Sequence, residues 1–157
     1  MSIWCYWNKF EKELLDMELS SHRDRLEKLE YLINVTEELL VLLLLSRSAI
    51  TDSEYRALIK ALPKPRNMET GTKYYTSEEK WKLQRIIDRL VDNPNLATWD
   101  DVFEMERIHN LIWDEYLEGI LKRTAAQSSN LLNQAKWVKM VVLITKAYLV
   151  SRGRNNF

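Results

Sequence analysis

Apolar residues recur along the chain at steps of three and four, the spacing that lines one face of an α-helix. Three threonines, each followed three residues later by an acid, resemble capping boxes at helix starts: Thr51, Thr76 and Thr98. The combined pattern predicts helices over residues 3–19, 20–45, 52–62, 77–92, 99–123 and 129–151, the first two of which could be continuous.

Few residues interrupt these helices, because the chain of 157 residues holds only three glycines and three prolines. Two prolines and a glycine make residues 63–76 the one long loop, and "DNPN" at 92–95 forms the next turn. Gly153 suits the C-terminal cap of the last helix, and residues 152–157 are expected to form a flexible tail. No segment alternates as a strand does. We therefore expect an all-α, single-domain bundle of five or six helices over residues 1–157.

The last helix, "NLLNQAKWVKMVVLITKAYLV", is apolar in nearly every direction. Only Lys136, Lys139 and Lys146 share a narrow strip. A helix of this kind is surrounded: it is either the central element of its own bundle or partly covered by another subunit. The central position is favoured, and the oligomer interface is the alternative.

The composition of the chain says more about its cellular compartment than about its function. The 23 basic and 23 acidic residues balance, so no global field attracts nucleic acid or an anionic membrane. Cys5 is the only cysteine, which excludes an intrachain disulfide and favours a reducing compartment. The longest apolar run, Leu39 to Leu45, is far shorter than the roughly 20 residues of a membrane span. We expect a cytoplasmic protein with no signal peptide, no membrane contact and no cofactor.

Charge is nevertheless unevenly placed. Residues 98–120 hold seven acids and one base, whereas residues 121–157 hold seven bases and no acid. Pairing between antiparallel helices is the simpler interpretation, and contact with nucleic acid is the alternative. The candidates for that contact are Lys64, Arg66, Lys73, Tyr74, Tyr75, Lys136, Lys139, Lys146, Arg152 and Arg154.

The step Glu106-x-x-His109 matches half of the carboxylate-bridged dimetal site found in helical bundles. No second such step exists in the sequence, although His22, Glu106 and His109 could form a mononuclear metal site. We expect a structural role instead, with Glu106 paired to His109 or to a base of the last helix such as Lys136 or Lys139. Glu115 and Glu118 are interpreted as a solvated helix face.

Six tryptophans exceed what packing in a domain of this size needs. Trp4, Tyr6 and Trp7 cannot all point inward from one helix, so they are candidates for a protein interface. Trp81, near the apolar face of its helix, is expected in the core. Without a catalytic constellation, the sequence favours a small accessory, adaptor or inhibitor-type protein that acts by protein association and self-associates. A nucleic-acid-binding accessory protein and a metal-dependent enzyme are the alternatives.

Overall fold

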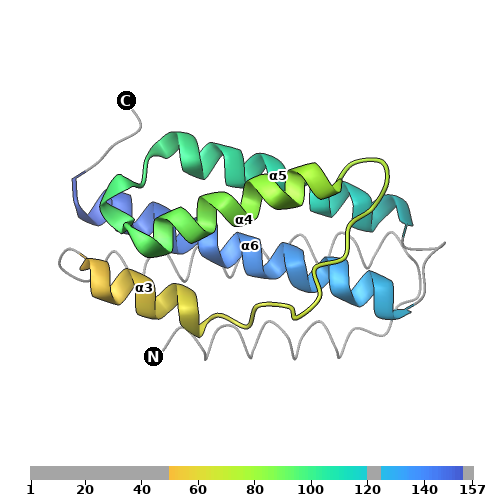
Figure 1. The fold of residues 1–157 in the computed structure, drawn as a ribbon, viewed down its shortest axis with the longest axis horizontal. Coiled ribbons are helices and arrows are strands. Elements are labelled where there is room, and N and C mark those ends of the chain that lie inside the picture. Colours follow the sequence, from red (N-terminus) through yellow and green to blue (C-terminus); the bar gives the residue numbers. More distant parts are fainter. Residues whose placement is uncertain (1–49, 120–124, 154–157) are drawn as a thin grey trace, which may run out of the picture. The chain divides into compact units, whose positions relative to one another are not determined.

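The computed structural model describes residues 50–119 and 125–153, and these residues form helices, turns and loops without a strand (Figure 1). The helices are α3 (Asp52–Ala61), α4 (Ser77–Asp92), α5 (Trp99–Gly119) and α6 (Ala125–Ser151), with a short 3-10 turn at Pro94–Leu96. The all-α prediction is thus confirmed for this part of the chain. The predicted helices over 3–19 and 20–45 lie outside the described residues, as do Trp4, Tyr6, Trp7 and His22.

The three threonines cap helices as the sequence predicts. Thr51 Oγ1 accepts from the Glu54 N–H at 3.1 Å, and the Glu54 carboxylate accepts in return from the Thr51 N–H at 3.3 Å. Thr98 and Asp101 make the same reciprocal pair, at 3.3 and 3.0 Å. Only half of the box forms at α4, where Thr76 Oγ1 accepts from the N–H of Glu79 at 3.5 Å. The Glu79 carboxylate bonds to α5 instead.

Breakers end the helices where the pattern indicates. Leu62, which precedes Pro63, has an extended backbone at φ −67° and ψ 143° and closes α3. Gly153 adopts φ +72° after α6, and its N–H donates to the carbonyl of Val150 at 3.0 Å. The start of the last helix differs: α6 begins at Ala125, not at residue 129, because the good helix formers before Ser129 extend it by a turn. The predicted end of the preceding helix at residue 123 lies outside the described residues.

Helix α6 contacts α5 along its length and α3 near its C-terminal end (Figure 1). The inner face of α5 contributes fully buried side chains, among them Met105, Ile108 and Ile112. Between residues 134 and 149 of α6, every side chain is buried except Lys139 and Lys146, which are half-buried. Burial on all sides explains the absence of a polar face in the sequence of this helix.

Hydroxyl groups join α3 to the C-terminal half of α6. The Thr145 hydroxyl donates to the carbonyl of Val141 at 2.7 Å, and the buried hydroxyl of Tyr55 lies 2.9 Å from the same Thr145 oxygen. Burial raises the pKa of Tyr55 to about 12. Nearby, the Tyr148 hydroxyl donates to the Asp52 carboxylate at 2.7 Å. These hydrogen bonds satisfy polar atoms that would otherwise be buried in the apolar interface without a partner.

The connection between α3 and α4, residues 62–76, is held down by side-chain amides of α6. Asn130 accepts from the N–H of Glu69 at 3.1 Å and donates to the carbonyl of Asn67. Gln134 donates to the Glu69 carbonyl at 2.6 Å. From α4, the Lys80 ammonium donates to the carbonyl of Met68 at 2.8 Å. Several of the loop's backbone groups are therefore satisfied by helix side chains.

None of the described helices is long and apolar enough to span a membrane.

Candidate functional site

Glu115 of α5 has the most buried carboxylate among the described residues, and it is 3% exposed. Its Oε1 atom accepts from three consecutive backbone N–H groups, those of Lys73 at 2.9 Å, Tyr74 at 2.7 Å and Tyr75 at 3.3 Å. The sequence analysis assigned Glu115 to a solvated face, and that was wrong: the loop folds over this side of α5 and covers it. Glu118 does remain exposed, and it pairs with the ammonium of Lys73 at 2.8 Å.

Gly71 is what lets the loop approach this carboxylate. A Cβ atom at position 71 would lie 1.9 Å from Cδ of Glu115, a distance that no real structure permits. The Gly71 N–H also donates to the carbonyl of Tyr75 at 2.8 Å, which closes the loop around the carboxylate. Because backbone amides occupy its oxygen, Glu115 serves to hold the loop in place.

The Glu106-x-x-His109 step lies on the side of α5 that meets α6. Glu106 Oε1 is 2.6 Å from Nζ of Lys146, and both side chains are partly exposed. The expectation of a base from the last helix is confirmed, and the base is Lys146. His109 is half-buried. Among the described residues, no three His, Cys, Asp or Glu side chains are grouped to hold a metal ion.

The residues considered for nucleic acid do not form one open row in the described part of the chain. Tyr75 has no exposed surface and Lys136 is 5% exposed, so neither is accessible to a base or a phosphate in this conformation. The Lys64 ammonium lies 5.3 Å above the ring of Trp137. Arg152 stacks on Tyr148 at 5.3 Å and lies 3.8 Å from the Asp52 carboxylate. Arg66 is exposed, and Arg154 lies outside the described residues.

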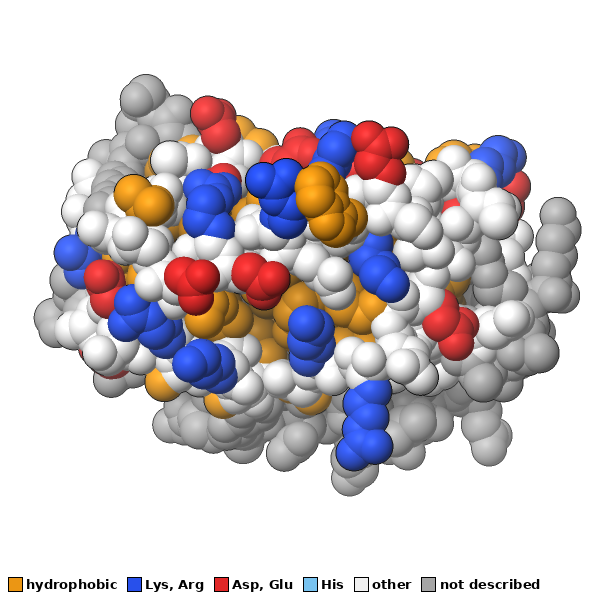
Figure 2. Space-filling model, in the orientation of Figure 1, with side chains coloured by type: hydrophobic (Ala, Val, Ile, Leu, Met, Phe, Trp, Pro, Cys, Tyr) orange, Lys and Arg blue, Asp and Glu red, His pale blue; other side chains and the backbone are white. Residues whose placement is uncertain are grey.

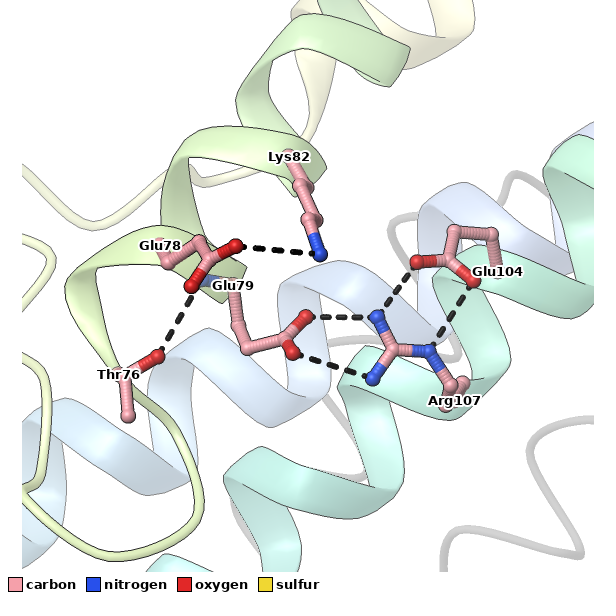
Figure 3. A network of polar contacts seen from close by, with 6 residues as sticks. All are labelled: Thr76, Glu78, Glu79, Lys82, Glu104 and Arg107. Atoms are coloured by element: carbon pink, nitrogen blue, oxygen red, sulfur yellow. Dashed lines mark hydrogen bonds and ion pairs between the residues drawn. The ribbon is translucent and has the colours of Figure 1, made fainter.

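A network of charges joins the outer edges of α4 and α5 (Figure 3). The Arg107 guanidinium bonds both oxygens of Glu79 on α4, at 3.2 and 2.6 Å, and both oxygens of Glu104 on α5, at 3.1 and 2.5 Å. The hydrogen bond from Arg107 lowers the pKa of Glu104, and the two carboxylates raise the pKa of Arg107. This clamp fixes α4 against α5.

The outward side of α4 is the least covered aromatic surface that the structure describes. Trp81 is 57% exposed, and the guanidinium of Arg85 lies 4.5 Å from the centre of its ring. The core assignment of Trp81 was wrong, because α4 buries Leu83, Ile87 and Leu90, and at about 100° per residue Trp81 points nearly opposite to Leu83. In Figure 2, acidic, basic and hydrophobic side chains alternate over this helix.

A groove of about 560 Å³ runs beside the same helix. Its walls come from α4 and the turn after it, between Lys82 and Asn93, and from Glu104 of α5. Ile86 is its apolar lining residue, and the other walls are charged or polar. The exposed indole and the groove therefore share one helix, an arrangement suited to binding another macromolecular surface.

Comparison with known proteins found no match: no protein-family model, no curated protein and no solved structure corresponds to this chain. The surface on α4 was missed in the sequence, although one signal was available. A row of polar and aromatic residues recurs on α4 at steps of three and four: Glu78, Trp81, Arg85, Asp88 and Asp92. Such spacing marks a helix face as clearly as a row of leucines does.

Proposed function

We propose that this chain acts by binding another protein, as a small helical accessory, adaptor or inhibitor-type protein, and that the outward face of α4 is a contact surface. The observation that carries the proposal is the 57% exposure of Trp81, with Arg85 stacked on its ring beside a groove. Tryptophan and arginine are enriched among the residues that dominate binding energy at protein interfaces. The cation over the ring also holds the indole in place before a partner arrives.

The use of the buried carboxylates favours binding over catalysis. Glu115 is occupied by loop amides, and Asp101 is occupied by Thr98 and Arg89. Both carboxylates are therefore committed to the fold.

For the whole chain we propose a single bundle of five or six helices around α6, located in the cytoplasm, with Trp4, Tyr6 and Trp7 as a further contact.

The test is a quantitative affinity purification from cells that express the tagged chain, either unchanged or as Trp81→Ala. We expect the recovered amount of at least one co-purified protein to fall about tenfold or more in the variant, the loss typical of a central anchor residue. An untagged copy of the chain counts as such a protein. Leu96→Ala is the matched control, since Leu96 is 51% exposed but lies outside α4. If the variant and the unchanged chain retain the same proteins in the same amounts, the proposal is wrong.

A further inference from the structure

The outward row of α4 has the spacing of a helix-pairing seam. Glu78, Trp81, Arg85, Asp88 and Asp92 follow one another at steps of three, four, three and four residues, which is the a and d pattern of a heptad repeat. The row is exposed along its length. Its composition, with charges in place of leucines, means that electrostatics decides which helix can lie against it.

Three charged residues of this face take part in no ion pair among the described residues. Lys82 lies 3.6 Å from Glu78, and Arg89 bonds Asp101 of α5. Within the described part of the chain, no ion pair involves Arg85, Asp88 or Asp92. The open charges therefore change sign along the helix, from positive at Arg85 to negative at Asp88 and Asp92.

A second α4 helix complements this sequence of charges only in one direction. A parallel copy would set Arg85 against Arg85 and Asp88 against Asp88, which is repulsive in both layers. An antiparallel copy can set Arg85 against Asp88 twice, once on each side of a two-fold axis. Sliding that pairing by one layer in one direction sets Arg85 against Arg85, and in the other direction sets Asp88 against Asp88. Each slide brings like charges together, so a single register is favoured.

The same register also matches a protrusion to a hollow. When Arg85 lies opposite Asp88 of a second copy, Trp81 lies opposite Asp92, beside the end of the groove that reaches Asn93. An exposed indole and a groove on one helix are self-complementary under a two-fold axis, as an isologous interface requires. The indole N–H can then donate to a carboxylate that the single chain leaves without an ion pair.

We propose that the partner of the α4 surface is a second copy of this chain, joined by antiparallel packing of the two α4 helices with Arg85–Asp88 pairs across the two-fold axis. This inference rests on the proposed function, because it names the partner of the same surface. The contact centres on one helix face, so we expect a weak, concentration-dependent dimer and not an obligate one.

The test uses charge reversal in the full chain, with sedimentation velocity as the measurement. Arg85→Asp places acids at both positions 85 and 88, and Asp88→Arg places bases at both, so the dimer of each variant alone should dissociate at least about tenfold more readily than that of the unchanged chain. An equimolar mixture of the two variants should restore the dimer, because every cross-pair is then opposite in charge. The double variant Arg85→Asp/Asp88→Arg should restore it as well.

Arg66→Asp is the matched control, since it reverses an exposed cation in the loop and should leave dimerisation unchanged. Circular dichroism of each variant separates loss of pairing from loss of fold. A chain that stays monomeric at millimolar concentration, or a mixture of variants that fails to dimerise, would overturn the inference. If the chain does not dimerise but Trp81→Ala still lowers the recovery of another protein in the affinity purification, the proposed function stands. Only the second copy is then excluded as the partner.

Discussion

Glu106 of α5 and Lys146 of α6 form an ion pair between the two longest described helices, with 2.6 Å between Oε1 and Nζ. The pair joins the acidic segment of the sequence to the basic one. Both side chains retain contact with water, at 36% exposure for Glu106 and 28% for Lys146. The pair is therefore a directional contact at the rim of the α5–α6 interface, not a buried charge.

Removing this pair should cost little. Glu106→Gln is expected to lower the free energy of unfolding by about 1 kcal/mol or less, because water screens partly exposed ion pairs. Urea denaturation measures the change, with Asp114→Asn as an exposed control on the same helix. A loss above about 3 kcal/mol would contradict this, since only a fully desolvated pair reaches that range.

Glu115 should matter far more than its neighbour Glu118. Glu115→Gln replaces a charged acceptor of three backbone N–H groups and is expected to cost about 1.5–3 kcal/mol, the range for hydrogen bonds to a charged group. Glu118→Gln changes an exposed pair with Lys73 and should cost about 0–1 kcal/mol. Equal losses in the two variants, measured by urea denaturation, would show that the loop does not depend on Glu115.

Gly71 and Glu115 should be coupled. Gly71→Ala alone forces the loop away from the Glu115 side chain and is expected to cost about 1–3 kcal/mol. In a Glu115→Ala background the colliding atoms are gone, so the same change should cost less than about 0.5 kcal/mol, as at an ordinary surface site. A double-mutant cycle measures the difference, and simple additivity would argue against the contact.

Acid sensitivity should depend in part on Glu104. Arg107 lowers the pKa of this carboxyl below its usual 4.5 in the folded chain. The charged form therefore stabilises the fold above pH 4.5, and this contribution is lost as the pH falls through the folded pKa. Stability of the unchanged chain should fall more steeply below pH 4.5 than that of Glu104→Gln. Urea denaturation across this range gives both slopes, and parallel slopes would contradict the expectation.

Alkaline pH should act through Tyr55. Its pKa is about 12 in the fold against the ordinary 10.0, so the folded chain holds a proton that the unfolded chain releases. The resulting stabilisation is present below pH 10 and is lost as the pH rises toward 12. Tyrosinate absorbance and circular dichroism, recorded together, should show ionisation of Tyr55 coinciding with unfolding. Tyr55→Phe should flatten this transition and cost about 1 kcal/mol at neutral pH from the lost Thr145 bond.

The parts of the fold that the sequence predicts depend on local chemistry. Thr51 and Thr98 cap helices through residues only three positions away, so the signal and its partner lie in one short window. Likewise, the absence of a polar face on α6 is visible without knowing its neighbours. Start points, breakers and all-round burial follow from such patterns.

The parts that the sequence could not predict depend on distant partners. Glu115 looks solvated in a helical projection, because the amides that cover it come from a loop about 40 positions earlier. The partner helix of Glu106 was predicted correctly. Which lysine of α6 it meets depends on how far α6 is shifted along α5, and the periodicity of the sequence does not show that shift. Trp81 is a different case, because a helical projection already places it nearly opposite Leu83, and only its apolar neighbours in the sequence suggested a core position.

The hydroxyl contact between Tyr55 and Thr145 has a consequence for synthesis. The two residues are 90 positions apart, so α3 leaves the ribosome long before its partner on α6 exists. At typical elongation rates of about 5–20 residues per second, the face of α3 that meets α6 waits several seconds before α6 can cover it. During that interval the nascent chain exposes apolar surface of the kind that chaperones bind. Assembly of this part of the core must therefore follow translation of residue 145.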